Sequence, residues 1–195
     1  MSAPRCLDLF CGRGGWTRGF LDAGYEVTGI DILPRHPMYP AEATYIQADL
    51  MGYDAGTGWD VIVASPPCTE FSQLTALRVY HPGGLPRDPQ KGMTLVYVTH
   101  RIIQQAKPQY WAIENVRGAR KWFHPLLGVP RFQNGPWCLW GDFPHFLLRN
   151  SAPMRKGLAA RSKKPAPSGL PNNASWRRAY IPYDIARGLA EACKP

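Results

Sequence analysis

Short apolar runs alternate with helix-like patterns over the first two-thirds of the chain. Five of these runs are short, rich in aliphatic side chains and bounded by Gly, Pro or Asp, which predicts buried strands at residues 5–11, 26–32, 44–48, 59–64 and 110–116. Residues 17–23 begin a helix, and residues 93–107 keep helical spacing until Pro108 ends the pattern. Strands that alternate with helices predict an α/β fold, with a mostly parallel sheet covered by helices on both faces.

The pattern changes after residue 134. Residues 135–148 are rich in aromatic side chains and predict a hairpin, whereas residues 150–175 lack periodicity and predict a loop. Residues 181–193 return to helical spacing, with Ile185, Leu189 and Ala192 on one face. We therefore expect one main domain formed by residues 1–134 and 176–195, with residues 135–175 as an inserted segment.

Composition and charge narrow the class of protein. The 195 residues are 45% hydrophobic and 19% charged, which is typical of one folded domain rather than a disordered chain. The net charge is +9, and residues 143–183 contain eight basic residues and no acid, leaving 15 basic against 14 acidic residues elsewhere. Such a stretch suits a phosphate-rich polymer, although a solvated surface loop has the same composition.

Cysteine usage and hydropathy exclude several classes. The five cysteines are odd in number and form no C-x-x-C pair, so we expect neither a disulfide framework nor a metal site. No run has the length of a membrane span, and the first residues lack the core of a signal peptide. We expect a soluble, cytoplasmic, monomeric protein.

Glycines and acids follow the first three predicted strands, where parallel sheets bind ligands. The first strand leads into DLFCGRGGW, a glycine turn that lets the backbone approach a ligand. The second ends in Asp31, 19 residues after Gly12, where an acid can hold two ribose hydroxyls, and Asp49 after the third can accept from an adenine amino group. This combination predicts a nucleoside cofactor, and a dehydrogenase would fit it as well.

A cysteine follows the fourth predicted strand, and a carboxyl lies at the end of the fifth. Cys68 stands in SPPCTEFS, after its strand and among small and polar residues, which favours a reactive thiolate over a core thiol. Glu114, in the Glu-Asn-Val that ends the fifth strand, can act as an acid if burial raises its pKa. An ion pair with Arg117 or Arg120 is the alternative for this carboxyl.

These motifs, taken in order, carry a resemblance. DLFCGRGGWTRGF, Asp31, Asp49, SPPCTEFS and PQYWAIENV resemble the DNA (cytosine-5) methyltransferase family over about residues 5–118, with a fainter echo in AYIPYDIARGLA, where that family completes its cofactor pocket. Amino-methylating enzymes carry Asn or Asp before Pro-Pro-aromatic at that strand end, and this chain does not. The resemblance implies a Rossmann-like S-adenosylmethionine-dependent methyltransferase fold for the main domain.

The resemblance also implies a mechanism. Cys68 would add as a thiolate to ring carbon 6 of a cytosine flipped out of double-stranded DNA, and Glu114 would hydrogen-bond to or protonate ring nitrogen 3. Carbon 5 then takes the methyl group of S-adenosylmethionine, and elimination frees Cys68. The segment 69–92 resembles the family's mobile loop that closes over the base.

The site residues that the resemblance implies fall into three groups, and no metal is among them. The catalytic group is Cys68, Glu114, Asn115 and Pro67. The cofactor-binding group is Asp8, Phe10, Gly12, Gly14, Gly15, Trp16, Asp31, Ile32, Asp49, Leu50 and Pro66. The DNA-binding group is Ser72, Arg78, Arg117, Arg155, Lys156, Lys163, Lys164 and Arg177.

Several positions depart from the family pattern. Thr69 stands where the family usually has Gln, the Gly-Asn of the last motif is replaced near Arg178, and the Gln-x-Arg-x-Arg strand has no counterpart unless Arg131 or Gln133 serves after a shift. The large recognition domain is absent, and the residues in its place are too few for an independent one. We therefore expect a minimal enzyme that binds DNA through backbone charge, with low or very short sequence preference. A compact modifier of this kind suits a phage or mobile element that masks its own DNA.

Three alternatives remain open from the sequence. The first uses a modified donor such as carboxy-S-adenosylmethionine, with Arg13 or Arg18 involved, and the second uses an RNA substrate. The third is a degenerate protein that only binds DNA, although Cys68 and Glu114 would then be unnecessary. The aromatic residues of 137–146 are expected to form a core hairpin, with stacking on an extruded base as the alternative.

Overall fold

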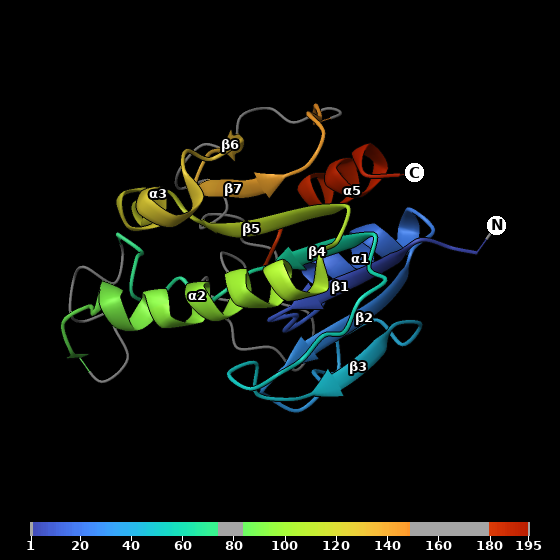
Figure 1. Ribbon diagram of the computed structural model, residues 1–195, viewed down its shortest axis with the longest axis horizontal. Helices are drawn as coiled ribbons and strands as arrows, with labels where there is room; N and C mark the ends of the chain where they lie inside the picture. The colour runs from blue at the N-terminus through green and yellow to red at the C-terminus, as the bar shows by residue number, and fades with distance from the viewer. Residues whose placement is uncertain (1, 74–83, 149–179, 195) are drawn as a thin grey trace, which may run out of the picture.

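The chain folds around one seven-stranded sheet in the order β3-β2-β1-β4-β5-β7-β6, as seen in the computed structural model, which describes residues 2–73, 84–148 and 180–194 (Figure 1). The strands are β1 (Arg5–Leu9), β2 (Glu26–Asp31), β3 (Thr44–Gln47), β4 (Val61–Ala64), β5 (Tyr110–Val116), β6 (Phe132–Asn134) and β7 (Trp137–Asp142). The first five strands are parallel to one another, and β7 runs antiparallel to both β5 and β6. The predicted mostly parallel α/β sheet is confirmed.

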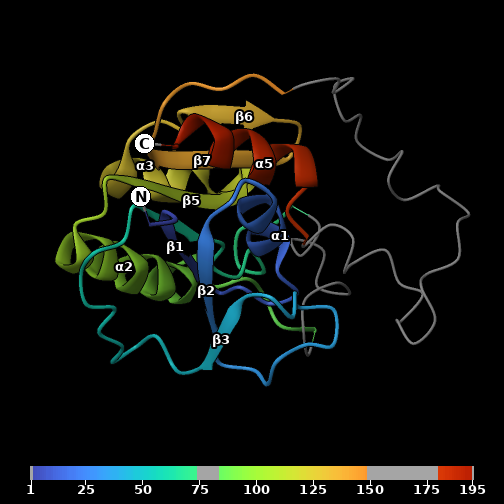
Figure 2. The same ribbon diagram turned by 90° about the vertical axis from the view of Figure 1, so that its right-hand side faces the viewer.

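Helices cover both faces of the sheet. The helices are α1 (Gly15–Asp22), α2 (Pro89–Ala106), α3 (Arg120–Leu127) and α5 (Tyr183–Ala192), with a short 3-10 turn, η3 (Arg117–Ala119), before α3. Figure 2 shows α1 and α5 on one face and α2 and α3 on the other. Alternate residues of the central strands supply the two cores: Val61 and Val63 face the α1–α5 side, and Ile62 and Ala64 face the α2–α3 side.

Some element boundaries differ from the sequence prediction. The first strand ends at Leu9 instead of residue 11, because Phe10 has a positive φ of 60° that turns the chain out of the sheet. The helix expected from residue 93 begins at Pro89, where the Asp88 side chain caps it by accepting from the backbone N–H groups of Gln90 and Lys91. Helix α3 was not predicted, and it carries Pro125 and several polar residues.

The aromatic hairpin begins earlier than predicted. It is formed by β6 and β7, so its first strand precedes residue 135, and residues 143–148 contain no strand. Trp137, Trp140 and Phe143 are buried, which confirms their expected place in the core. Because β7 pairs with β5 along its whole length, this segment is part of the sheet that carries the site.

Candidate active site

A tight turn after β1 forms one wall of the site. Phe10, Gly12 and Gly14 have φ values of 60°, 48° and 80°, a run of left-handed residues that folds the backbone back before α1. The backbone N–H of Gly12 donates to Asp31 Oδ2 at 2.9 Å, and the N–H of Leu33 donates to Asp31 Oδ1 at 3.0 Å. Asp31 therefore joins this turn to the end of β2 and presents a carboxylate at the edge of the sheet.

Asp8 supports the turn from inside the protein. Its Oδ2 accepts from the backbone N–H of Thr17 at 3.1 Å and from the Thr17 hydroxyl at 2.6 Å. Burial raises the pKa of Asp8 to about 7, although both Thr17 bonds favour its charged form. The side chain is 1% exposed, so it positions α1 and the turn rather than meeting a ligand through open surface.

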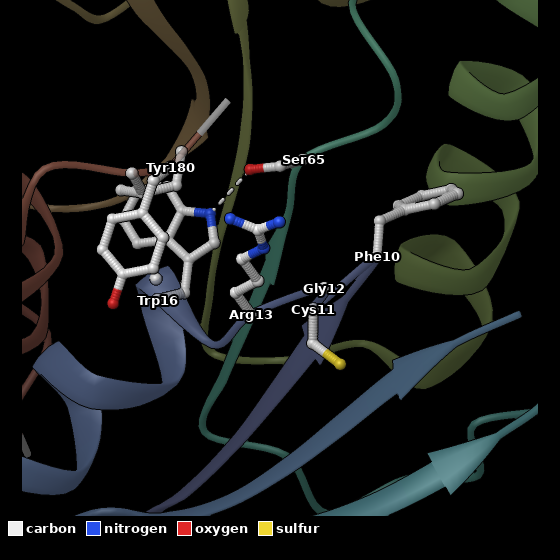
Figure 3. Close-up of a pocket in the computed structure, with 9 residues that line it drawn as sticks. Phe10, Cys11, Gly12, Arg13, Trp16, Ser65 and Tyr180 are labelled. Atoms are coloured by element: carbon white, nitrogen blue, oxygen red, sulfur yellow. Dashed lines mark hydrogen bonds between the residues drawn. The ribbon is translucent and has the colours of Figure 1, made fainter. Parts of the chain in front are cut away.

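A cavity of about 270 Å³ opens beside this turn (Figure 3). Its walls come from the turn and α1, from the end of β4 and from the segment before α5, and the lining residues are Phe10, Cys11, Gly12, Arg13, Gly15, Trp16, Ser65, Tyr180 and Ile181. Gly15 lies so close to Ile181 that a Cβ atom there would be 3.0 Å from the Ile181 backbone nitrogen. The segment before α5, which belongs to the motif AYIPYDIARGLA, thus closes the cavity formed by the glycine turn and α1.

The remaining expected cofactor residues lie at the ends of β2 and β3. Ile32 is 61% exposed and offers apolar surface beside Asp31. The exposed Asp49 accepts from the backbone N–H of Met51 at 2.9 Å through one oxygen. Leu50 instead packs in the α2–α3 core, so its side chain supports this corner from beneath.

The cysteine follows β4 in a single turn of chain. The backbone N–H groups of Phe71 and Ser72 donate to the Cys68 carbonyl at 3.0 and 2.9 Å, so the turn is closed by hydrogen bonds. Pro66 is buried, Pro67 is exposed and Cys68 is half-buried. Burial and the nearby Glu114 carboxyl raise the pKa of the Cys68 thiol to about 11, so the resting group is a thiol at neutral pH.

Two buried polar residues end β5 next to this cysteine. Glu114 is 9% exposed, and burial raises its pKa to about 7 against the opposing effect of a hydrogen bond from the Ser65 side chain. Asn115 is fully buried; its Nδ2 donates to the Pro66 carbonyl at 2.9 Å, and its Oδ1 accepts from the Val116 N–H at 2.9 Å. Asn115 therefore holds the Pro-Pro-Cys segment against β5 and positions Cys68.

The expected DNA-binding residues divide into two groups. Ser72 lies in the turn after Cys68, where its carbonyl accepts from Arg87 at 3.0 Å, and Arg117 is exposed directly after β5. The others, Arg78, Arg155, Lys156, Lys163, Lys164 and Arg177, lie outside the described residues.

The two substitutes considered for the missing arginine motif lie around the hairpin. Arg131 forms a 3.9 Å ion pair with Asp142 and stacks over the Phe143 ring. Gln133 is exposed on β6. These contacts connect the hairpin to itself rather than to the cavity.

The structure also adds residues that the sequence did not single out. Ser65, Tyr180 and Ile181 line the cavity, and Ser65 contacts both Trp16 and Glu114. Signals for all three were present, because Ser65 begins SPPCTEFS and the other two belong to AYIPYDIARGLA. Among the residues described, no group of His, Cys, Asp and Glu could hold a metal ion, and no helix has the length and hydropathy to cross a membrane.

The residues around the cavity fit S-adenosylmethionine. Asp31 supplies an acceptor for ribose hydroxyls, the turn at Gly12 brings backbone close to a ligand, and the Trp16 ring supplies apolar wall. The cavity reaches Ser65, one end of the segment that carries Cys68. A ligand bound there would contact Ser65, which the strand register places beside Glu114.

This sheet order, glycine turn and strand-end acid define a Rossmann-like domain of the class that binds nucleoside cofactors. A family model described as C-5 cytosine-specific DNA methylase matches residues 4–124, which is more than half of the chain. The chain belongs to this family.

Several proteins are similar to this chain over part of their length. The type II methyltransferase M.XorII of Xanthomonas oryzae is 30% identical over 161 residues, covering 73% of this chain and 36% of the relative. M.AplI of Arthrospira platensis is 31% identical over 116 residues, covering 57% of this chain and 31% of the relative. The chain thus spans about a third of the length of these two relatives. A solved structure of a prophage-encoded E. coli protein, assigned as a DNA modification methyltransferase, aligns with a TM-score of 0.48 and 17% identity over 71% of this chain and 46% of the other.

Proposed function

We propose that this protein transfers a methyl group from S-adenosylmethionine to carbon 5 of cytosine in DNA through a covalent adduct of Cys68. The observation that carries the proposal is the meeting of Cys68 and Glu114 at the sheet edge where Ser65 lines the cavity. Membership of the C-5 cytosine-specific family supports the choice of base and of ring atom. Cytosine stacked in a duplex hides both carbons, so the base is flipped out before reaction.

The chemistry needs one nucleophile and one acid. The Cys68 sulfur, once it has lost its proton, forms a bond to carbon 6, and the ring electrons move toward carbon 5 while Glu114 donates its proton to nitrogen 3. S-adenosylmethionine supplies the electrophilic methyl group. After a proton leaves carbon 5 to a base, the bond between carbon 6 and sulfur breaks and the ring double bond returns. Nitrogen 3 gives its proton back to Glu114, and Cys68 leaves as the thiolate.

The protonation states at rest support these roles. With a pKa of about 7, Glu114 keeps a substantial protonated fraction at neutral pH, when an ordinary glutamate has almost none. Its negative charge raises the pKa of Cys68, so a neutral Glu114 makes the thiolate easier to form. The acid form of one residue thus favours the active form of the other.

Low or short sequence specificity is part of the proposal. Trp137 and Trp140 are buried and fill the core, so their side chains are not available to contact DNA bases. The stretch that remains for a recognition module is short and basic, and it suits contacts to the phosphate backbone.

Mass spectrometry of nucleosides tests the reaction. DNA and RNA are incubated separately with the protein and isotope-labelled S-adenosylmethionine, with Cys68→Ala in parallel. We expect labelled 5-methylcytosine in DNA with the wild type only, and a covalent adduct on DNA containing 5-fluorocytosine. No product, or product in RNA alone, would overturn the proposal, and a larger mass gain from cell-derived cofactor would identify a modified donor.

Bisulfite sequencing of a treated plasmid tests specificity. We expect conversion-resistant cytosines in many contexts. Resistance confined to one motif longer than a dinucleotide would reject a minimal, permissive enzyme while leaving the reaction itself intact.

A further inference from the structure

Ser65 occupies a position shared by the cofactor cavity and the catalytic carboxyl. It directly follows β4, and the pairing of Ala64 with Ile113 places it beside Glu114, the next residue of β5. Neighbouring residues in register on parallel strands point their side chains to the same face of a sheet. The Ser65 backbone N–H donates to the Leu9 carbonyl at 3.2 Å, which fixes this residue to β1 as well.

A chain of hydrogen bonds passes through the Ser65 hydroxyl. The indole Nε1 of Trp16 donates to Ser65 Oγ at 2.9 Å, the bond drawn in Figure 3. Because an indole N–H only donates, the hydroxyl is the acceptor there and directs its own proton elsewhere. The register of β4 and β5 places the Glu114 carboxyl beside this hydroxyl, and a hydrogen bond from Ser65 to that carboxyl opposes the effect of burial on the pKa of Glu114. Trp16 is 2% exposed, so it holds the hydroxyl in a fixed orientation.

We propose that Ser65 is a positioning residue for methyl transfer: oriented by Trp16 in the wall of the cofactor cavity, it hydrogen-bonds the Glu114 carboxyl and controls when that group carries a proton. The inference rests on the proposed function, in which Glu114 is the acid. It assigns to Ser65 a role that is neither cofactor binding alone nor attack on the base.

The sign of the effect follows from the donor. A hydroxyl that donates to a carboxylate stabilises the charged form, whereas burial favours the neutral form. Removal of the hydroxyl leaves burial unopposed, so the pKa of Glu114 rises above its value of about 7. A Glu114 that keeps its proton carries no negative charge next to Cys68. Because that charge raises the pKa of Cys68, its loss lowers the pKa of the thiol.

Cysteines and arginines are the other ionisable groups near Glu114. Cys68 and, from β7, Cys138 both have pKa values of about 11 and are uncharged at neutral pH. Arg117 and Arg120 are exposed, and their positive charges lower the pKa of Cys138. The Arg13 side chain extends toward Ser65 in Figure 3, so it is the cation to control for.

Carbon-13 NMR of glutamate carboxyls tests the proposal without relying on activity. The chain has five glutamates, and Glu114→Gln assigns the resonance of Glu114. We expect Ser65→Ala to move its titration midpoint up by about one pH unit, because a hydrogen bond to a charged group contributes that much. Ser65→Thr keeps the hydroxyl and restores the wild-type midpoint. Trp16→Phe keeps the ring but not the N–H and gives a smaller upward shift.

The rate profile provides the catalytic readout. The active form carries a Cys68 thiolate and a protonated Glu114, and the pKa of Cys68 is the higher of the two. We therefore expect kcat/KM to rise with pH while Glu114 keeps its proton. Once Glu114 loses its proton, kcat/KM levels off, because each further gain in thiolate is offset by loss of the acid. In Ser65→Ala the levelling moves to higher pH by the same amount as the NMR midpoint. Arg13→Met, which keeps the hydroxyl, should shift both less than Ser65→Ala.

The outcomes separate the two proposals. A wild-type protein that forms no 5-methylcytosine refutes the proposed function whatever the NMR shows. An active wild type whose titration and rate profile coincide with those of Ser65→Ala refutes the role of Ser65. A shift in Ser65→Thr as large as in Ser65→Ala refutes it too, since it would assign the effect to packing.

Discussion

Glu114 combines burial with a polar partner, and its burial makes the stability of the fold depend on pH. The side chain is 9% exposed, and its pKa is raised from 4.5 to about 7. A carboxyl with a raised pKa binds its proton more tightly in the folded state than in the unfolded state. The folded protein therefore loses stability as the pH rises from the ordinary glutamate range to above 7.

Replacement of this carboxyl should stabilise the protein at high pH. We expect Glu114→Gln to raise the free energy of unfolding by about 2–3 kcal/mol at pH 8, and to give almost no gain at pH 4, where the wild-type acid is protonated in both states. Urea unfolding at the two pH values measures this. Activity should fall by about 10²–10⁴-fold at the same time. A variant less stable than wild type at pH 8 would show that the charged form is favoured in the fold.

Asn115 is expected to act through the position of Cys68. In Asn115→Ala the Pro66 carbonyl and the Val116 N–H both lose their partner, which should destabilise the fold by about 1–3 kcal/mol. The turnover number should fall more than the affinity for S-adenosylhomocysteine, because Asn115 does not line the cofactor cavity. Calorimetry and single-turnover methylation check this; an equal loss in both would place Asn115 in cofactor binding.

At the scale of elements, α1 and α5 decide whether the cavity is closed. A Cβ atom on Gly19 would lie 2.5 Å from the Ala186 Cβ and 2.7 Å from the Ala186 carbonyl carbon, so only glycine permits this approach of the two helices. The Tyr25 hydroxyl donates to the Ala190 carbonyl at 3.2 Å and adds a polar link. Packing of α5 holds Tyr180 and Ile181 at the cavity.

A larger residue at this crossing should damage folding and cofactor binding together. We expect Gly19→Ala to destabilise the protein by about 1–3 kcal/mol and to weaken binding of S-adenosylhomocysteine, since α5 must move away. Gly52→Ala is the matched control, because no atom lies within 4 Å of the added Cβ. Thermal unfolding and calorimetry compare the two variants. Unchanged cofactor binding in a destabilised Gly19→Ala would show that the packing of α5 does not affect the cavity.

The same scale shows what the sequence could and could not predict. Strands such as β4, with four consecutive buried aliphatic or small residues, stand out because each side chain meets a helix on one face or the other. The end of β1 was misplaced because Phe10 adopts a positive φ that its residue type does not announce. Helix α3 was missed because Phe123 is its one buried residue, so the helix has little apolar periodicity to read.

For the site, sequence motifs predicted residues but not their connections. Cys68 and Glu114 could be selected because Cys68 follows β4 and Glu114 lies near the end of β5, and the parallel order of these strands brings both to one edge. The link from Trp16 through Ser65 to Glu114 joins residues up to 98 positions apart, and it depends on side-chain directions that no motif specifies. The contacts of the buried Asn115 could not be predicted either, because its hydrogen-bond partners are backbone atoms.

At the scale of the whole molecule, charge separates one part of the chain from the rest. The eight basic residues of 143–183 stand without an acid, against a nearly neutral remainder. Each contact between a cation and a phosphate releases a counterion, so binding through this stretch should depend steeply on salt.

Neutralising two of these residues should reduce the salt dependence of DNA binding by an amount that follows from the number of charges removed. For Lys163→Gln with Lys164→Gln we expect the slope of log K against log salt to become shallower by about 1.8 on duplex DNA. The control is Lys107→Asn with Lys194→Gln, two exposed lysines after α2 and α5, where Asn tolerates the positive φ of residue 107. Fluorescence anisotropy at several salt concentrations compares them; equal slopes would assign DNA binding to another surface.

The late position of α5 in the chain has a consequence for synthesis. A ribosome releases the glycine turn and both reactive side chains long before it releases Tyr180 and Ile181, which complete the cavity. The nascent protein therefore carries an exposed α1 face, with Trp16 and Phe20 on it, until α5 emerges and docks.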